Sequence, residues 1–313
     1  MKAKKIVTIG IPCFNEEENV ERTYNITQAI LKKAPDYIFQ FLFVDNGSTD
    51  ETRRKILNVI KKDKTARGVF LSRNFGFEAS VAALMHNAVG EAIVILPCDL
   101  QDPPELILKF IKKWEQGYNI VAGRYLNTQE DIFTTLLRRA FYYIFKRISD
   151  LDIPVNTSEF SLLDRKALDA LRTLPEKFRF FRGLRVWIGF KVAFVKYHRK
   201  QRLYGSSAYN WISYFKYAER GIYGFSYLLL DLLMYASLFL VCLSVTLVVI
   251  YVGYHSFWRI PYETLPTLLL AMFFLGNVLL FGMGILGKYI QVLVEEVKNR
   301  PVYVIDKIVG VKK

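Results

Sequence analysis

Two uncharged apolar stretches near the C-terminal end of the chain restrict its possible folds more than any other feature. Residues 232–251 and 265–286 each run for about 20 residues without a charged side chain, which is the length that an α-helix needs to cross a ~30 Å hydrocarbon core. The chain is also 52% hydrophobic, close to the upper limit for a soluble protein. The sequence therefore predicts a hairpin of two transmembrane helices within residues 227–290.

Basic residues gather on both outer sides of these stretches, whereas the connecting loop carries only Arg259 against Glu263. The basic residues before the first stretch are Lys196, Arg199, Lys200, Arg202, Lys216 and Arg220, and those after the second are Lys288, Lys298, Arg300 and Lys307. By the positive-inside rule, both flanks face the cytoplasm. The start of the chain, MKAKK, leads into a strand-like run and not into a cleavable signal peptide. We therefore expect a multi-pass protein of the inner (cytoplasmic) membrane with most of its chain in the cytosol.

The net charge of +14 raises the question of a nucleic-acid partner. Zinc-finger spacing and RNA-binding signatures are absent, and the charge is densest beside the apolar stretches. The charge therefore favours a membrane surface over nucleic acid. The three cysteines, Cys13, Cys98 and Cys242, form no CxxC pair, which argues against a disulfide framework or a zinc site.

The first two hundred residues alternate short apolar runs with helix-like stretches. The apolar runs are residues 6–11, 39–44, 68–71, 92–96 and 120–122. This alternation predicts an α/β domain with a doubly wound, mostly parallel sheet. Ligands of such sheets bind at the carboxyl ends of the strands.

Three of the joints between these runs resemble helix N-caps followed three residues later by glutamate. The pairs are Asn15 with Glu18, Ser48 with Glu51, and Asp102 with Glu105. Each pattern predicts that a strand ends in a loop that opens a helix.

Two aromatic, basic stretches, residues 134–148 and 209–225, have helical spacing. Both suit amphipathic helices at the membrane interface, although the first is also compatible with core packing. We divide the chain into a cytosolic domain (1–205), an interfacial helix (206–226), two transmembrane helices (227–290) and a cytosolic tail (291–313).

The stretch ILPCDLQDPPELI, residues 95–107, ends an apolar run in three polar side chains. A helix cap explains Asp102 but not Asp99 and Gln101 beside it. Oxygen ligands at a strand edge suit Mg²⁺ or Mn²⁺, which bind through one or two carboxylates and take further ligands from substrate phosphates. The stretch therefore predicts a metal site that works with a nucleotide.

Other loops of the same layer supply candidate nucleotide contacts. Asp45 follows a buried run and can accept hydrogen bonds from a base or ribose, or serve as a turn residue before Gly47. Arg73, in SRNFGFE, is a candidate for a diphosphate or an ordinary surface arginine. The loop IPCFNEEEN joins them as a third candidate.

Together these stretches resemble the family 2 glycosyltransferases with the GT-A fold, in the branch that transfers a sugar onto a polyprenyl phosphate. The resemblance spans nearly the whole chain and rests on seven motifs in order: IPCFNEEENV, VDNGSTDET, LSRNFGFEA, DLQDPPELI, NTSEFSLLDRKALDAL, RLYGSSAY and GMGILGKYI. The last also fits GxGxxG, but it lies inside an apolar span and not after a strand, so we reject a dinucleotide site there.

The resemblance implies roles for particular residues. It places Pro12, Asn15, Glu16 and Asp45 at the nucleotide, Asp99 with Gln101 at the metal, and the catalytic carboxylates at Glu159 and Asp102.

The chain departs from the family pattern at four positions or stretches. Pro97 replaces the first Asp of Asp-x-Asp, Asn46 replaces a frequent second Asp, Ser158-Glu159-Phe160-Ser161 replaces Gly-Asp-Phe-Arg, and Ala208 replaces the Lys of Ser-Lys-Tyr. A changed donor, a changed acceptor or lost activity are all compatible with these changes.

We therefore expect a membrane-anchored inverting glycosyltransferase that moves a hexose from a nucleotide sugar, with UDP the expected nucleotide, to undecaprenyl phosphate at the cytoplasmic face. Arg199 and Arg202 are candidates for the acceptor phosphate, or ordinary interfacial basic residues. The resemblance also suits a homotetramer.

Two alternatives from other classes remain. The first is a catalytically silent homologue that acts as a scaffold or regulator of an envelope glycan pathway, and the second is a processive polysaccharide synthase. The synthase is disfavoured because two spans leave little room for a polymer channel and the sequence has no QxxRW-like motif.

Overall fold

The computed structural model describes residues 4–126, 156–177, 179–200 and 265–310, with isolated positions between 233 and 257. The predicted interfacial stretches 134–148 and 209–225, and with them Arg202 and Ala208, lie outside the described residues. Most of the first predicted span does so as well. Those predictions stay predictions.

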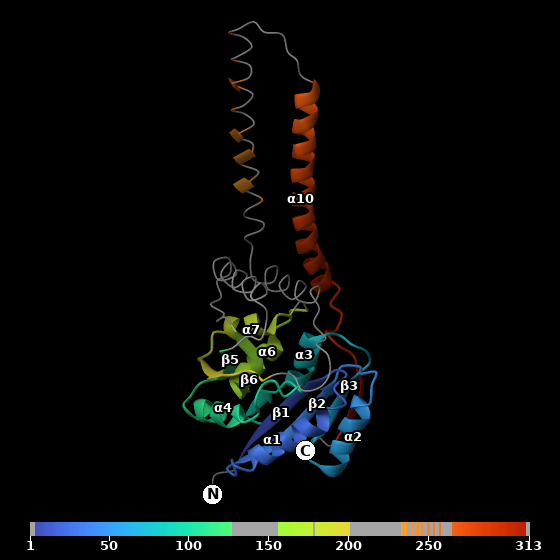
Figure 1. Ribbon diagram of the computed structural model, residues 1–313, viewed down its shortest axis with the longest axis vertical. Coiled ribbons are helices and arrows are strands. Elements are labelled where there is room, and N and C mark those ends of the chain that lie inside the picture. The colour runs from blue at the N-terminus through green and yellow to red at the C-terminus, as the bar shows by residue number, and fades with distance from the viewer. Residues whose placement is uncertain are drawn as a thin grey trace.

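A mixed sheet forms the centre of the described domain (Figure 1). Its strand order is β7-β5-β6-β4-β1-β2-β3-β8. The strands are β1 (Lys5–Cys13), β2 (Tyr37–Asp45), β3 (Arg67–Leu71), β4 (Ala92–Ile95), β5 (Ile120–Tyr125), β6 (Thr157–Asp164), β7 (Val192–Tyr197) and β8 (Ile305–Val309). The four neighbours β3, β2, β1 and β4 are parallel, so their carboxyl ends meet at one edge of the sheet.

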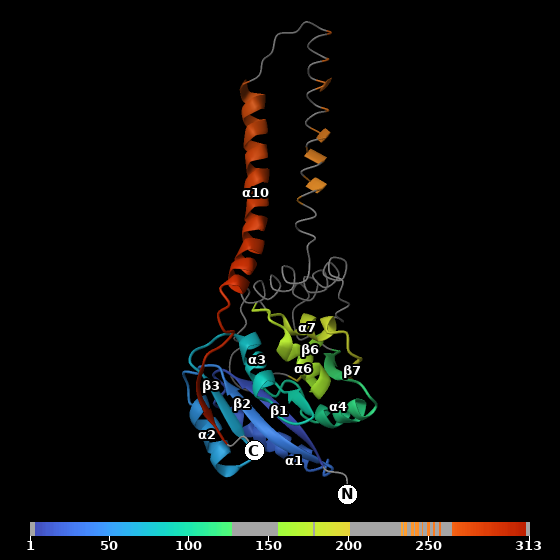
Figure 2. The ribbon, with the colours of Figure 1, turned by 180° about the vertical axis from the view of Figure 1, so that it is seen from behind.

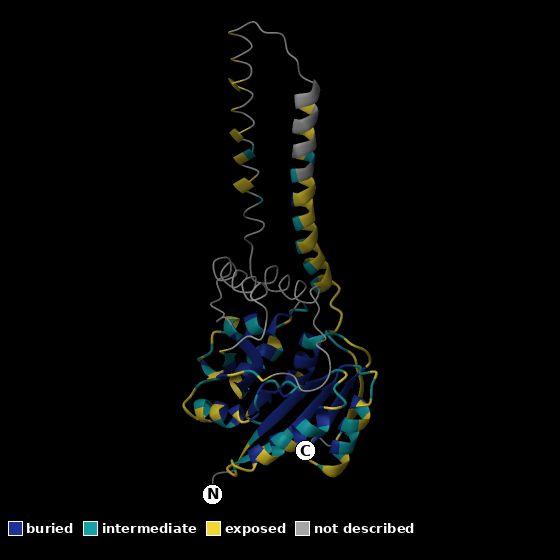
Figure 3. Ribbon diagram, in the orientation of Figure 1, coloured by how far each residue is buried: buried dark blue, intermediate teal, exposed yellow. Residues whose placement is uncertain are grey.

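All five predicted apolar runs are strands, and the predicted α/β class is confirmed. Strands β1 and β2 are apolar on both faces because helices cover both sides of the sheet. Phe41 and Phe43 pack on one face, while Leu42 and Val44, which alternate with them, pack on the other. Figure 3 shows the sheet as the most deeply buried part of the molecule.

Helices divide between the two faces according to these two cores. Side chains of α1 (Val20–Leu31), α2 (Thr52–Lys62) and α4 (Leu106–Glu115) pack into one core. The other core takes side chains of α3 (Phe77–Asn87), α6 (Arg165–Thr173) and α7 (Phe181–Trp187). The result is a three-layer domain, which Figure 2 shows from behind.

The three predicted N-caps are wrong. Helices α1, α2 and α4 begin at Val20, Thr52 and Leu106, and none has a side-chain cap. The side chains of Asn15 and Ser48 instead bond the neighbouring loop, where they satisfy backbone N–H groups of another segment. Asp164, which no cap prediction included, does cap its helix: its Oδ1 accepts from the backbone N–H of Ala167 at 2.8 Å.

A long helix, α10 (Leu265–Val297), leaves the domain and contains the second predicted span (Figure 1). Within the described residues, Val278–Val297 is long and apolar enough to cross a membrane, with a mean hydropathy of 1.6, and its described side chains are mostly exposed. Leu233, from the first predicted span, lies against α10: a Cβ placed on Gly282 would be 3.1 Å from its Cδ2 atom.

The chain returns from α10 to the sheet, which the sequence did not predict. Strand β8 pairs antiparallel with β3, and the backbone N–H of Ser72 donates to the carbonyl of Val304 at 3.0 Å. The residues assigned to a simple cytosolic tail therefore complete the edge of the sheet.

The Asp164 cap is testable. Asp164→Ala removes the acceptor for Ala167 and the partner of Asn119 Nδ2 at 2.6 Å. We expect it to cost ~1–2 kcal/mol and to lower the melting temperature of the detergent-solubilised protein. Asp169→Ala, on the same helix, removes the ion pairs of a half-exposed carboxylate with Arg165 and Arg172 and should shift the melting temperature less. Equal shifts for the two variants would contradict the assignment of the cap.

Candidate active site

The loops that follow β1, β2, β3 and β4 lie at one edge of the sheet because these strands are parallel. They carry Asn15, Arg73 and Asp99, and Asp45 is the last residue of β2 at the same edge. Pro12 is buried inside β1, opposite Val44. The sheet topology therefore brings the candidate nucleotide and metal residues of separate motifs to a single edge.

Direct hydrogen bonds connect the first two loops. The backbone N–H of Asn15 donates to Ser48 Oγ at 3.0 Å, and Asn15 Oδ1 accepts from the N–H of Thr49 at 2.9 Å. Glu16 adds a backbone donation to Thr52 Oγ1 at 2.7 Å. Asn15 has a φ of 53°, a left-handed conformation that asparagine tolerates better than most residues. The two loops are thus held as one surface.

Asp45 ends β2 and is 2% exposed. Its Oδ1 accepts from the N–H of Ser48 at 3.1 Å, which closes a tight turn at Gly47. Gly47 has a φ of 71°, and a Cβ there would lie 2.5 Å from the carbonyl carbon of Arg73. Only glycine allows the loops after β2 and β3 to approach so closely.

The side chain of Asn46 joins the same two loops and is 3% exposed. Its Nδ2 donates to Asn74 Oδ1 at 3.0 Å and to the carbonyl of Gly76 at 3.1 Å, and its Oδ1 accepts from the N–H of Phe75 at 3.0 Å. An aspartate has no N–H to offer these two acceptors. The departure from the family pattern at this position therefore has a local structural reason.

Arg73 is exposed and lies on its own loop. Its guanidinium is 4.2 Å from the Phe75 ring centroid, and its Nη1 donates to the carbonyl of Asn74 at 3.1 Å. To reach a diphosphate, its side chain would have to leave these contacts.

Asp99 is half-buried just beyond β4, in a loop with an unusual backbone. Its Oδ1 accepts from the N–H of Gln101 at 3.2 Å, and between them Leu100 has a φ of 56°. That left-handed conformation costs a leucine about 1–2 kcal/mol. Such strain is found at functional sites, where the surrounding structure enforces it.

Asp102 points into the protein and is 1% exposed. Its Oδ1 accepts from the Tyr197 hydroxyl and lies 3.7 Å from Arg199 Nε, while its Oδ2 accepts from Ser158 Oγ at 3.3 Å. Burial raises the pKa of Asp102, and Arg199 and the hydroxyl of Tyr197 offset part of that rise. Burial and the negative charge of Asp102 also raise the pKa of Tyr197.

Arg199 contacts this carboxylate from the segment after β7. Burial alone would lower its pKa, but the charges of Asp102 and then Asp99 outweigh burial and raise the pKa. The backbone N–H of Lys200 donates to the carbonyl of Gln101 at 2.9 Å. The segment that follows β7 is therefore part of the candidate site.

Glu159 lies on β6 and forms an ion pair that the sequence did not predict. Arg182 Nε, on α7, donates to Glu159 Oε1 at 2.6 Å, with the two side chains 19% and 11% exposed. Arg185, one turn further on, donates to the carbonyl of Ser158 at 3.0 Å and is 3% exposed. The sequence FRGLR could have indicated this pair, because arginines spaced by three residues lie on one face of a helix.

The oxygen ligands at this edge suit a divalent metal ion whose remaining ligands come from a substrate. The described residues contain no group of three carboxylate, histidine or cysteine side chains that could hold a metal by itself. Asp99 offers one partly exposed carboxylate with Gln101 beside it, and Asp102 is committed to Tyr197 and Ser158. Magnesium commonly binds through one or two carboxylates together with substrate phosphates.

Comparison with known proteins identifies the family. The sequence profile described as glycosyl transferase family 2 matches residues 8–172, which extend from within β1 to the last turn of α6 and include Asp45, Asp99 and Glu159. The chain belongs to glycosyl transferase family 2.

Relatives of this glycosyltransferase match it over nearly its full length. An uncharacterised glycosyltransferase of Synechocystis sp. is 34% identical over 98% of this chain and 96% of its own length. The SfII prophage-derived bactoprenol glucosyl transferase of Shigella flexneri is 32% identical over 96% of this chain and 97% of its own length. The mannosyl-3-phosphoglycerate synthase structure from Rubrobacter xylanophilus is 16% identical, covers 69% of this chain and 71% of its own, and has a TM-score of 0.48.

The contacts of Asn46 yield a pH-dependent prediction. Asn46→Asp would place a buried carboxylate against the oxygens of Asn74 and Gly76, and Asn74 cannot reverse its amide without losing the bond from the N–H of Gly76 at 2.8 Å. Burial and these acceptors should raise the pKa of the new carboxyl in the folded protein, so stability should fall as the pH rises.

We expect Asn46→Asp to lower the melting temperature more at pH 8 than at pH 5, with a cost of ~1–3 kcal/mol at the higher pH. Asn46→Ala loses the same hydrogen bonds without adding a charge, so its loss of stability should not depend on pH. Equal melting temperatures for Asn46→Asp and the wild type at pH 8 would show that the loops adapt to the charge.

Proposed function

We propose that this family 2 glycosyltransferase moves a hexose from a nucleotide sugar, UDP-linked in the simplest case, to a polyprenyl phosphate. The observation that carries the proposal is that Asp99, the candidate metal ligand, lies near Arg199, while Arg182 pairs with Glu159 on β6, the strand that neighbours β4. Phosphate groups on both substrates require such cations. The relative named as a bactoprenol glucosyl transferase supports a lipid phosphate as the acceptor.

The donor would bind across the joined loops after β1 and β2. In this proposal Asp45 accepts hydrogen bonds from the base or ribose, Asn15 and Glu16 contact the nucleotide, and the buried Pro12 lies beneath them. Arg73 would turn from the Phe75 ring toward the diphosphate. The short bonds between Asn15, Ser48 and Thr49 keep this surface in place before the donor arrives.

Asp99, with Gln101, would hold Mg²⁺ or Mn²⁺ against the donor diphosphate. A bound divalent cation supplies charge neutralisation for the departing nucleotide. Since Pro97 stands where relatives often have a second aspartate, Asp99 provides the carboxylate of this site almost alone. Removal of the Asp99 carboxylate should therefore cause a severe loss of transfer activity.

In the transfer, the bond between the anomeric carbon and the diphosphate oxygen breaks, and an oxygen of the lipid phosphate attacks the opposite face of the sugar. The nucleotide leaves as its diphosphate, and the anomeric configuration is inverted. A phosphate monoester has a second pKa near 6, so most of the acceptor is already dianionic at neutral pH. Removal of a proton by Glu159 would therefore add little.

The ion pair with Arg182 suggests a different role for Glu159. A lone carboxylate would repel the acceptor dianion, whereas Arg182, 2.6 Å away, offsets that charge. We propose that Glu159 orients Arg182 and that Arg182 faces the acceptor phosphate. Arg199, and Arg202 beyond the described residues, would contact the same phosphate.

Asp102 is better assigned to positioning than to contact with substrate. It is 1% exposed and bonded to Tyr197 and Ser158. In this proposal it holds the Arg199 guanidinium in place beside the candidate metal ligand.

The membrane arrangement completes the proposal. The domain of residues 1–205 and the tail 291–313 would lie in the cytoplasm, joined by an interfacial helix (206–226) and a two-helix hairpin (227–290) in the inner membrane. The contact of Leu233 with Gly282 supports the hairpin. Assembly as a homotetramer would bring several such anchors together.

A catalytically silent homologue is the second candidate, favoured by Pro97 in place of a metal-ligating aspartate. Washed membranes offered a panel of UDP- and GDP-sugars with undecaprenyl phosphate and Mn²⁺ distinguish the two. We expect the lipid-linked sugar to form with at least one donor. Donor binding without transfer for the whole panel would favour the silent homologue.

In the same assay, Asp99→Asn should abolish transfer and its dependence on Mn²⁺, because the neutral amide cannot neutralise the metal. Glu105→Gln removes an exposed carboxylate of the same loop and should leave the rate unchanged. Wild-type turnover in Asp99→Asn would refute the metal assignment.

Glu159 gives a test of the role proposed above. Glu159→Gln should retain measurable transfer at pH 8, where the acceptor is fully ionised, with a larger effect on the KM for undecaprenyl phosphate than on kcat. Glu159→Asp should not exceed the wild type, because a carboxylate shortened by about 1.5 Å would misplace Arg182. Loss of transfer by Glu159→Gln at every pH, with donor binding intact, would instead indicate an essential base.

A further inference from the structure

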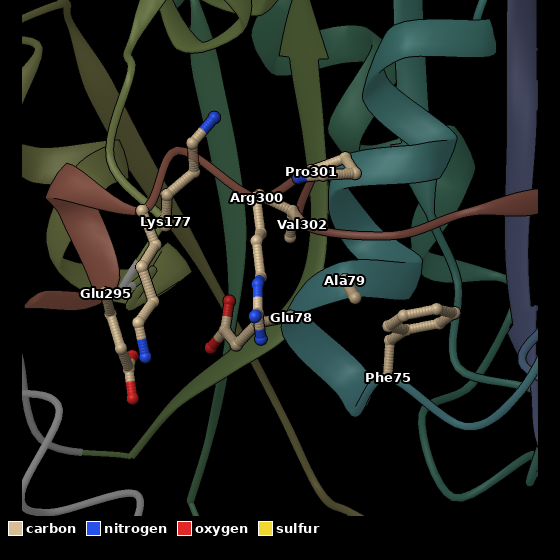
Figure 4. Close-up of a pocket in the computed structure, with 9 residues that line it drawn as sticks. Phe75, Glu78, Ala79, Lys177, Glu295, Arg300, Pro301 and Val302 are labelled. Atoms are coloured by element: carbon tan, nitrogen blue, oxygen red, sulfur yellow. The ribbon is translucent and has the colours of Figure 1, made fainter.

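A pocket of about 340 Å³ lies where the end of α10 meets the sheet domain (Figure 4). Its walls come from three separate parts of the chain: the start of α3, the loop at Lys177, and the segment from Glu295 to Val302. The volume is within the range of ~300–1,000 Å³ that is typical of small-molecule sites. None of the residues proposed to bind the donor, the metal or the acceptor lines this pocket.

Hydrogen bonds on both sides hold the pocket open in a defined shape. The backbone N–H of Lys177 donates to Glu296 Oε1 at 2.7 Å, which ties the last turn of α10 to the domain. Beyond the pocket, the Tyr303 hydroxyl lies 3.3 Å from His86 Nδ1 and the chain enters β8. The connecting segment is therefore anchored at each end.

The side chains that line the pocket favour an anion. Lys177, Lys298 and Arg300 contribute three positive charges, against Glu78 and Glu295. Glu78 is 6% exposed and already accepts from the N–H of Phe181 at 3.1 Å through Oε2. Figure 4 shows Arg300 reaching down toward Glu78, with Glu295 at the side of the pocket. One positive charge is thus in excess.

The first turn of α3 adds to this preference. Its N-cap is Gly76, with a φ of 92° and no side-chain cap, and a Cβ on Gly76 would meet nothing within 4 Å. Glu78 and Ala79 of this turn line the pocket. A helix N-terminus carries a partial positive charge and unsatisfied N–H groups, which add to the attraction of the three basic side chains.

The position of the pocket relative to the membrane favours a lipid as the source of the anion. Lys298 and Arg300 follow the apolar span predicted at residues 265–286, on the flank that the positive-inside rule assigns to the cytoplasm. Basic side chains just beyond the cytoplasmic end of a membrane helix attract the headgroups of anionic lipids.

We propose that this pocket binds the phosphodiester headgroup of an anionic phospholipid. The site is separate from the active site, and the proposal does not depend on which sugar or acceptor the enzyme uses. An occupied pocket would contact Phe75, whose backbone N–H donates to Asn46 in the donor loop. Lipid binding would therefore steady a loop that is proposed to hold the nucleotide.

The test uses the full-length protein in neutral detergent and three probes: dihexanoyl phosphatidylglycerol, dihexanoyl phosphatidylcholine and inorganic phosphate. Native mass spectrometry counts bound lipid, and the rise in melting temperature measures affinity. We expect saturable binding of one phosphatidylglycerol, with much weaker binding of the other two. Binding of inorganic phosphate as tight as that of phosphatidylglycerol would overturn the lipid assignment, as would the absence of a saturable lipid site.

Four variants locate the bound lipid. Arg300→Gln and Lys298→Gln should each weaken phosphatidylglycerol binding about fivefold, since one basic residue near anionic lipid contributes ~1 kcal/mol. Glu295→Gln removes a competing negative charge and should strengthen binding. The matched control is Lys307→Gln, an exposed lysine on β8 outside the pocket, which should have no effect.

Equal weakening by Lys307→Gln and Arg300→Gln would mean that lipid is held by general surface charge, and would refute the site. Weaker binding in Glu295→Gln would refute it as well. Because Glu295 is exposed and its replacement is expected to increase affinity, this variant remains decisive even if Arg300→Gln does not fold.

Discussion

The carboxylate of Asp102 is almost completely buried. The groups that hydrogen-bond it or offset its charge come from distant parts of the chain. Tyr197 and Arg199 come from the end of β7 and the segment after it, and Ser158 comes from β6. Loss of one partner of a buried ionic group typically costs about 3–5 kcal/mol. The loop that carries Asp99 is therefore anchored by the need to satisfy the buried carboxylate of Asp102.

This arrangement separates the two acidic residues of one short motif. Asp102 directs its charge inward and balances Arg199, so Asp99 keeps its carboxylate partly exposed for a ligand. The left-handed conformation of Leu100 is what turns the chain between these opposite directions. The strain at Leu100 is tolerable because the inward bonds of Asp102 hold the loop from below.

Much of the fold could be predicted because it depends on local patterns. Apolar runs of strand length appear as β1 to β5, and their parallel order brings Asn15, Asp45 and Asp99 to one edge. The predicted helix caps were wrong because Asn15 and Ser48 form hydrogen bonds with each other's loop, and a local sequence motif does not encode such contacts. Arg182 was missed for a similar reason: its contact with Glu159 exists only once α7 packs beside β6. Strand β8 escaped notice because its five residues are largely exposed and carry no buried alternation.

Strand β8 has a consequence for how the protein is made. It is the last element of the sheet to leave the ribosome, and α10 precedes it in the chain. During synthesis the edge of β3 stays unpaired until α10 has been made, and an open strand edge is a template for wrong partners. A chain truncated within α10 would therefore present a bare β3 edge to other proteins. Completion of the sheet depends on synthesis of the long helix that precedes β8.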